Sequence, residues 1–174
     1  LILHTLIAKL KTMETDITVL SQTPKQTEKD YQVKSIQRTN VPEIIKALND
    51  ADLFISGGGS LFQDATGPGS PIYYGGLIYL AKFFEVPILF WSQGVGPLNN
   101  YLSCQLTKMA LKASRTVTVR DEDSAKLVKL LTEDEPEVTA DPVWLYNLEN
   151  TKPLYSKEDT WNVGVSLRSW PELN

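Results

Sequence analysis

The sequence predicts an α/β protein with a doubly wound, Rossmann-like parallel sheet. Four or five units of strand followed by helix succeed one another along the 174 residues. The strands read as continuous apolar runs, such as PILFW at 87–91, which is typical of parallel strands covered on both faces. Nine of the ten glycines lie between Gly57 and Gly96, a stretch that contains several expected strand ends. Together these observations indicate a sheet whose strand ends form a glycine-rich edge.

The first third of the chain is expected to contain a helix, a strand, a loop and a second helix. Apolar residues at helical spacing open the chain, namely Leu3, Leu6, Ile7 and Leu10. Residues 16–20 (DITVL) form a short β-rich run, whereas residues 23–30 are polar and contain Pro24, which indicates a loop. Pro42 suits the first turn of a helix at about 42–50.

The rest of the chain alternates between strands and helices. A buried strand beginning near residue 52 (DLFISGGG) runs into three glycines. The elements expected after it are a helix near 70–84, a strand at 87–91, a helix near 99–113, a strand at 115–119, a helix near 121–131 and a short strand near Val138. Because ligands of such sheets bind beyond the carboxyl ends of the strands, the residues that follow each strand are the first candidates for function.

The chain is expected to comprise one domain and the start of another. Residues 1–147 form the Rossmann-like domain, residues 148–160 lose apolar periodicity and suggest a linker, and residues 161–174 resume as a strand. The opening within a helical pattern indicates that the first strand and loop of the domain are missing. We therefore expect a fragment.

Composition and charge exclude several classes of protein. The net charge is -4 and no cluster of Lys or Arg interrupts it, which argues against a nucleic-acid backbone or an anionic membrane as main partner. No apolar run approaches the roughly 20 residues of a membrane-spanning helix, and no signal peptide is evident. Cys104 is the single cysteine, so no internal disulfide can form. We expect a soluble, cytoplasmic protein.

Two glycine turns follow neighbouring strands and suggest a ligand pocket. Glycine triplets let backbone N–H groups approach a ligand without interference from Cβ atoms. They also occur in tight turns where chains simply pack closely, so that alternative stays open. The candidate binding residues of the turns are Gly57, Gly58, Gly59, Ser60 and Gln63 in the first (SGGGSLFQD) and Gln93, Gly94 and Gly96 in the second (SQGVGP).

Charged candidates follow three strands. Arg120 is expected at the end of the strand at 115–119, where its planar fork suits a carboxylate or phosphate. Asp121, Asp123 and Ser124 come next in a first helical turn, where acids often only complement the helix dipole. Asp141 precedes Pro142 and is more typical of a turn. No group of His, Cys and Asp residues has the spacing of metal ligands, and we expect neither a metal nor another cofactor.

Asp64 stands in a stretch that is almost free of charge. A desolvated carboxylate there could have a raised pKa, in a range useful for acid or base catalysis. The alternative is that Asp64 caps the helix near residue 70 or holds the loop ATGPGS.

The segments SGGGSLFQD, IYYGGLIYLAKFFEVPILFWSQGVGP, VRDEDS and ADPV together resemble the polysaccharide pyruvyl transferase family over residues 52–143. The likeness is strongest to bacterial members that act on cell-wall polysaccharides anchoring surface-layer proteins, and GVSLRSW is similar to the family's entry into a second domain. The resemblance implies a two-domain fold similar to glycosyltransferase type B, of which this chain would be the N-terminal half, with the active site between the domains.

The family's reaction uses phosphoenolpyruvate to install a pyruvate ketal across two hydroxyls of a sugar, commonly on a lipid-linked intermediate. The resemblance therefore implies that the protein would reach the membrane only peripherally, through its lipid-linked acceptor. Ketal formation requires an acid, a base and groups that hold a phosphate and a carboxylate. Asp64 and Arg120 are the candidate catalytic residues, as carboxylate and cation, and Arg168 is a second cation that, like Ser124, is a candidate for substrate binding. Since this set is small, we expect the fragment to be inactive alone.

The chain departs from the family pattern between Asp64 and Tyr73, where ATGPGSPI lacks an expected basic residue. Two other functions remain open. One is a nucleotide-sugar glycosyltransferase of the same architecture, and the other is a non-catalytic module that binds an anion or a sugar.

Overall fold

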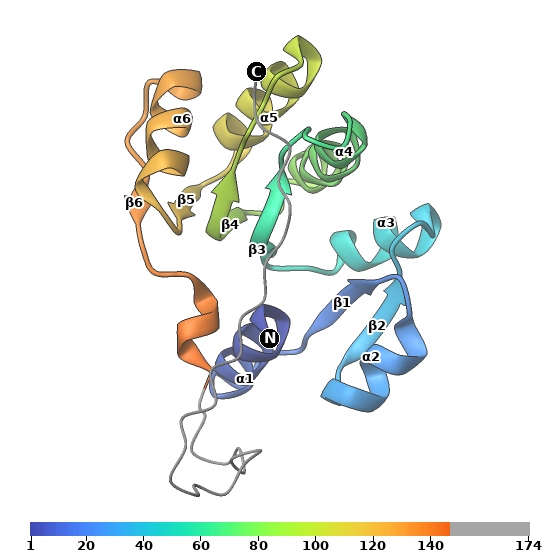
Figure 1. Ribbon diagram of the computed structural model, residues 1–174. Coiled ribbons are helices and arrows are strands. Elements are labelled where there is room, and N and C mark those ends of the chain that lie inside the picture. Colours follow the sequence, from blue (N-terminus) through green and yellow to red (C-terminus); the bar gives the residue numbers. More distant parts are fainter. Residues whose placement is uncertain (147–174) are drawn as a thin grey trace, which may run out of the picture.

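The computed structural model describes residues 1–146 as alternating helices and strands (Figure 1). The elements are α1 (Ile2–Lys11), β1 (Thr18–Ser21), α2 (Pro24–Tyr31), β2 (Lys34–Gln37), α3 (Val41–Asn49), β3 (Phe54–Phe62), α4 (Gly69–Phe83), β4 (Ile88–Val95), α5 (Tyr101–Ala113), β5 (Thr116–Val119), α6 (Glu122–Thr132), β6 (Glu137–Val138) and the 3-10 helix η1 (Pro142–Leu145). The expected linker at 148–160, the second-domain segment at 161–174 and Arg168 lie outside the described residues.

All strand pairs in this part of the chain are parallel. One sheet has the order β3-β4-β5-β6, and β1 and β2 pair as a separate two-stranded sheet. Parallel strands joined by helices confirm the predicted α/β class and are consistent with a Rossmann-like, doubly wound fold. The sheet is nevertheless divided into two, whereas the sequence predicted one.

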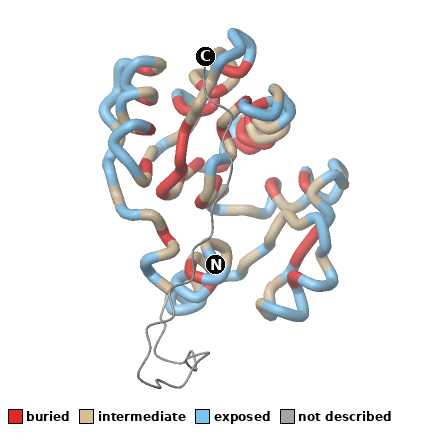
Figure 2. Tube along the Cα trace, in the orientation of Figure 1, coloured by how far each residue is buried: buried red, intermediate tan, exposed pale blue. Residues whose placement is uncertain are grey.

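A single hydrophobic core joins the two sheets. Phe62, Phe90 and Ile88 are fully buried between the strands of the larger sheet and its helices. Ile36 of β2 belongs to the same core through Ile44 and Leu48 of α3. Figure 2 shows the longest buried run along β4, whose residues are all buried or half-buried. The helix α3 therefore connects the smaller sheet to the larger one.

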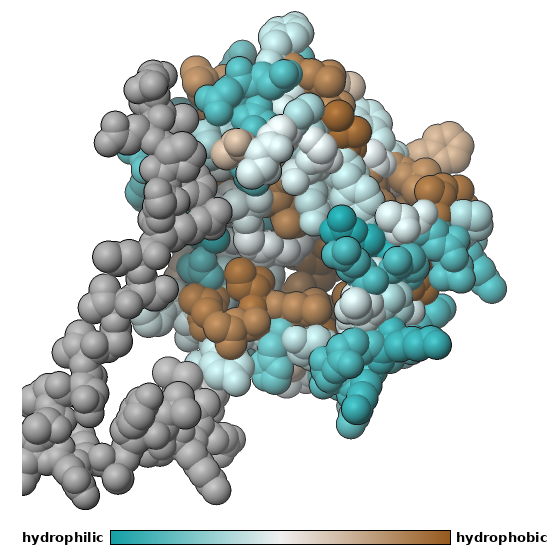
Figure 3. All heavy atoms as spheres, turned by 45° about the vertical axis from the view of Figure 1, so that its right-hand side comes forward, coloured by the Kyte–Doolittle hydropathy of each residue, from teal (hydrophilic) through white to brown (hydrophobic). Residues whose placement is uncertain are grey.

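The predicted loop at 23–30 is wrong, because this segment forms α2. Pro24 occupies the first turn, where its missing N–H costs no hydrogen bond, and Gln32 ends the helix in a left-handed conformation. Thr27 is buried and shares a hydrogen bond of 2.7 Å with Ser21 of β1. In Figure 3 hydrophilic side chains gather at the lower right of the face, on the side of the β1–α2–β2 segment, next to an apolar patch at the lower centre. The polarity of α2 thus reflects an exposed helix.

The sequence analysis also missed β2, because only Ser35 and Ile36 of its four residues are buried. The other predicted helices and strands are present with bounds shifted by a few residues. Within residues 1–146, no helix has the length and the apolar character needed to cross a membrane.

Candidate functional site

The ends of β3, β4 and β5 lie side by side at one edge of the larger sheet. Gly59 pairs with Gln93 in the β3–β4 register, and Gln93 pairs with Val119 in the β4–β5 register. Arg120 directly follows Val119, and its Nη2 donates a hydrogen bond of 2.9 Å to Oγ of Ser60. The two glycine turns and Arg120 are therefore brought together, as parallel strands require.

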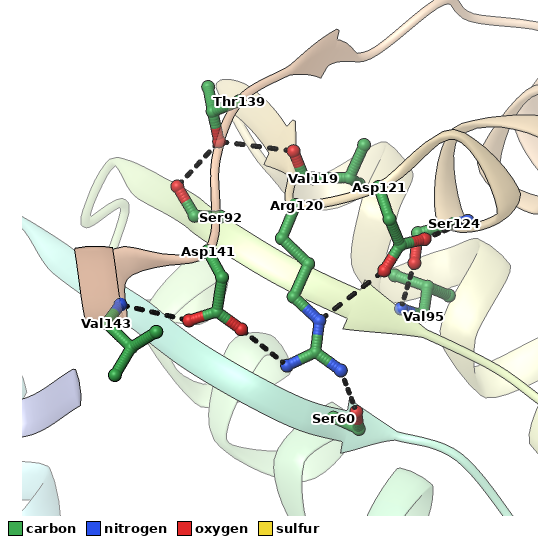
Figure 4. Close-up of polar contacts among 10 residues, drawn as sticks. All are labelled: Ser60, Ser92, Val95, Val119, Arg120, Asp121, Ser124, Thr139, Asp141 and Val143. Carbon is green, nitrogen blue, oxygen red and sulfur yellow. Dashed lines mark hydrogen bonds and ion pairs between the residues drawn. The ribbon is translucent and has the colours of Figure 1, made fainter. Parts of the chain in front are cut away.

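Arg120 links three segments of this edge (Figure 4). Besides Ser60, its guanidinium contacts Asp121 through Nε at 3.4 Å and Asp141 through Nη1 at 3.2 Å. The side chain is 27% exposed. A Cβ atom on Gly94 would lie 2.8 Å from Nη2, so the guanidinium rests directly on the backbone of β4. All three nitrogens of Arg120 therefore already have partners within the chain.

The two carboxylates on Arg120 also cap helices. In Asp121 one oxygen accepts the N–H of Ser124 at 2.7 Å and the other faces Arg120. Asp141 divides its oxygens in the same way between the N–H of Val143 at 3.0 Å and Arg120. Burial alone would raise the pKa of Asp121, but the bonds from Ser124 and the charge of Arg120 bring it below its ordinary value. Two carboxylates around one guanidinium leave a net negative charge here.

Hydroxyl groups that the sequence analysis did not single out fasten β6 to β4. Oγ of Ser92 and Oγ1 of Thr139 share a hydrogen bond of 2.7 Å, and Thr139 also donates to the carbonyl of Val119. Ser124 belongs to the same framework, because its Oγ accepts the N–H of Val95 at 2.9 Å (Figure 4). Single Ser and Thr residues in β-rich sequence carry no signal that distinguishes them as cross-strand links.

The glycine triplet has two different roles. A Cβ atom on Gly58 would lie 1.9 Å from Ile2 of α1, and one on Gly57 would lie 3.1 Å from Leu6. These two glycines allow α1 to pack against β3. They therefore fit the alternative that the sequence analysis left open, in which glycines serve the close packing of chain segments. Gly59 has a φ of +90°, and no described atom lies within 4 Å of its hypothetical Cβ. Of the triplet, Gly59 is therefore the one whose backbone faces open space.

The two glutamines also make internal contacts. Gln93 is fully buried, and its amide nitrogen donates to the carbonyl and to Oγ of Ser56 at 2.8 and 2.7 Å. Its Oε1 has no partner among the described residues. Oε1 of Gln63 accepts the N–H of Ala65 at 2.9 Å. In this arrangement both side chains hold the backbone near the site.

Asp64 anchors the segment that precedes α5. Its carboxylate is buried and accepts the N–H of Asn99 at 2.8 and 3.0 Å and the N–H of Asn100 at 2.8 Å. Burial alone would raise the pKa of Asp64, but these N–H groups bring it below its ordinary value. The expectation of a raised pKa is therefore wrong, because the bonds favour the ionised form. The alternative interpretation holds in part: the side chain bonds to Asn99 and Asn100 and not to α4, while the backbone carbonyl of Asp64 accepts the N–H of Gly67 in the loop ATGPGS at 2.9 Å.

No three residues among His, Cys, Asp and Glu come together as metal ligands within the part of the chain that the structure describes. The geometry at the strand ends thus consists of backbone turns, hydroxyl groups and one guanidinium between two carboxylates.

A sequence model of the family described as "Polysaccharide pyruvyl transferase" matches residues 1–173. The match covers every segment that forms the strand-end site. No curated protein and no solved structure matches the chain.

Proposed function

The chain belongs to the polysaccharide pyruvyl transferase family, so it is a transferase of that kind, and from this premise we propose the reaction that it catalyses. Phosphoenolpyruvate is the donor and two hydroxyls of one sugar are the acceptors. The product is a pyruvate ketal of the sugar, with inorganic phosphate released. The family match over residues 1–173 carries this proposal, and the open backbone at Gly59 beside Ser60 supports it.

The reaction balances in two additions at C2 of the donor. A proton adds to the methylene carbon, and one sugar hydroxyl loses its proton as its oxygen bonds to C2. The C2–O bond to phosphate then breaks, the second hydroxyl oxygen bonds to C2, and its proton leaves with the phosphate. The protein must transfer protons and hold a dianionic or trianionic donor, which requires fixed N–H groups and cations.

The contacts favour positioning roles for the two residues that the sequence analysis named as catalytic. Arg120 holds Ser60 and the helix caps at Asp121 and Asp141 in place, so we propose that it shapes the strand ends. Ionised Asp64 holds Asn99 and Asn100. We propose that the proton-transfer groups lie outside residues 1–146 and that Arg168 contributes to the site from a second domain.

The finer features of the proposal come from the motif resemblance. We propose a two-domain architecture similar to glycosyltransferase type B, with the strand ends of residues 1–146 forming one wall of the cleft. The acceptor is a cell-wall polysaccharide precursor on a lipid carrier. The reaction takes place in the cytoplasm, where the enzyme reaches the membrane only through that acceptor.

The test is an assay of the full-length protein with phosphoenolpyruvate and a panel of sugars and lipid-linked saccharides. The expected result is phosphate release that depends on the acceptor, together with a ketal product identified by mass spectrometry and NMR. Turnover of a nucleotide sugar would indicate the glycosyltransferase alternative. Saturable donor binding without turnover on any acceptor would indicate a non-catalytic module.

A further inference from the structure

A cavity lies beyond the ends of β2 and β3, at the junction of the two sheets. Its volume is about 350 Å³. It is lined by Arg38, Thr66, Gly67, Gly69, Ser70, Tyr73 and Tyr74. These residues come from the segment after β2, the loop after β3 and the start of α4. The volume falls in the range of sites that hold small ligands.

Arg38 is the one charged residue in the lining of this cavity. Its backbone is fixed from two sides, because its N–H donates to the carbonyl of Ser21 at 2.9 Å and its carbonyl accepts the hydroxyl of Tyr73 at 2.6 Å. The guanidinium carbon lies 5.3 Å from the centre of the Tyr73 ring. With the described residues this guanidinium forms neither an ion pair nor a hydrogen bond. The N–H groups of Arg38 thus have no partner among the described residues, whereas each nitrogen of Arg120 has one.

The tyrosine that supports Arg38 remains a donor. Burial raises the pKa of the Tyr73 hydroxyl, and the charge of Arg38 offsets only part of that effect. The hydroxyl thus stays protonated at neutral pH and keeps its bond to the Arg38 carbonyl. A cation held over an aromatic ring also loses less freedom when it binds a ligand.

The remaining lining offers hydroxyl and backbone donors. The hydroxyls of Thr66 and Ser70 make no hydrogen bond with the described residues, and no described atom lies within 4 Å of a Cβ placed on Gly67 or Gly69. The 15-residue helix α4 begins at Gly69 with no acidic residue in its first turn. The helix dipole adds to the positive potential of Arg38 at this point.

We propose that this cavity is an oxyanion-binding subsite in which Arg38 holds a phosphate or carboxylate group. The assignment of the ligand to the reaction rests on the proposed function. Two substrates could supply such a group, namely the phosphoenolpyruvate donor and the phosphate groups of a lipid-linked acceptor.

The first experiment measures the binding of inorganic phosphate and of phosphoenolpyruvate to the full-length protein by calorimetry. Because a charge-assisted contact is lost, Arg38→Gln should weaken the binding of phosphate or of phosphoenolpyruvate by roughly tenfold or more, or raise the KM of a lipid-linked acceptor by that factor. Lys34→Gln is the matched control, because it removes one exposed positive charge from β2, the strand that Arg38 follows. Arg38→Lys keeps the charge without the fork and should give an intermediate loss even if the glutamine variant folds poorly.

The arms of the experiment separate the two sources of the anion. A loss confined to phosphoenolpyruvate assigns the subsite to the donor, and a raised KM confined to phosphate-bearing acceptors assigns it to the acceptor. Phosphate binding that depends on Arg38 in a protein without transferase activity would support the subsite while removing the proposed function. Folded Arg38 variants that match Lys34→Gln in every binding constant and in every KM would overturn the inference.

Discussion

Replacing Asp64 by Asn tests whether this residue acts mainly as an anchor. An amide presents one oxygen where the carboxylate has two, so the N–H of Asn99 or of Asn100 loses its short bond and meets an NH2 group. A hydrogen bond to a charged group contributes about 1.5–3 kcal/mol, so exchanging the carboxylate for an amide weakens the bonds to both N–H groups. We expect Asp64→Asn to lower the free energy of unfolding by about 2–4 kcal/mol.

Urea unfolding of the full-length protein, followed by tryptophan fluorescence and circular dichroism, measures this loss. Asp52→Asn is the matched control, because Asp52 is exposed, and it should change stability by less than about 0.5 kcal/mol. Turnover by folded Asp64→Asn should stay within about tenfold of the parent. An Asp64→Asn protein as stable as Asp52→Asn would refute the anchoring role, especially if its turnover fell by about a hundredfold.

The pH dependence supplies a second measurement on the same variant. The pKa of Asp64 in the folded protein is lower than its ordinary value of 3.8. The ionised carboxylate therefore makes its whole contribution to stability at pH values above 3.8. This contribution is lost as the pH falls through the lower, folded pKa. The stability difference between the parent and Asp64→Asn should therefore be constant near neutral pH and shrink below about pH 4.

Four further variants test the strand-end site and its helices. Arg120→Gln separates Ser60 from Asp141 and should lower the free energy of unfolding by about 1–3 kcal/mol, with a melting temperature equal to the parent's arguing against the link. Gly94→Ala places a Cβ 2.8 Å from the Arg120 guanidinium and should lower the free energy of unfolding by about 1 kcal/mol or more. Gly76→Ala in α4 is the control, because its Cβ meets no described atom, and it should raise the free energy of unfolding by about 0.5–1 kcal/mol. Denaturant midpoints measure both changes, and equal shifts would contradict the contact between Gly94 and Arg120. Asp121→Asn should destabilise the protein at neutral pH, and this effect should disappear as the pH falls below 3.8, the ordinary pKa of the carboxyl group. Thermal melts of the parent and the variant across this pH range measure the difference. A difference that does not change with pH would argue against an ionised cap at Asp121.

Sequence patterns predicted the larger sheet because its signals are local. The apolar run of β4, the β-branched run of β5, the Asn100 cap of α5 and the polar first turn of α6 lie within or next to the elements that they define. The helix α2 was missed because Pro24 and polar residues are equally typical of loops. Its burial depends on one residue, Thr27, which contacts the neighbouring strand β1.

The candidate site was predictable in position but not in chemistry. Parallel topology brings Gly59, Gln93 and Arg120 to one edge regardless of their partners. The partners of Asp64 lie 35 and 36 residues further along the chain, so the sequence could show an isolated carboxylate but not the direction of its pKa shift. Arg38 gave no signal at all, because its contact with Tyr73 joins the turn after β2 to helix α4, 35 residues further along the chain.

The division into two sheets has a dynamic consequence for the oxyanion cavity. A two-stranded sheet is marginally stable by itself, so the amides of β1 and β2 should exchange with deuterium through local opening at a lower free energy than those of β4. Arg38 follows β2 directly, and the Tyr73 hydroxyl connects it to α4. Each opening of the smaller sheet therefore separates the cation from the helix that completes the cavity. An oxyanion bound between them should slow exchange in β2 in proportion to its occupancy and leave β4 unchanged, so that the exchange rates of β2 report its binding.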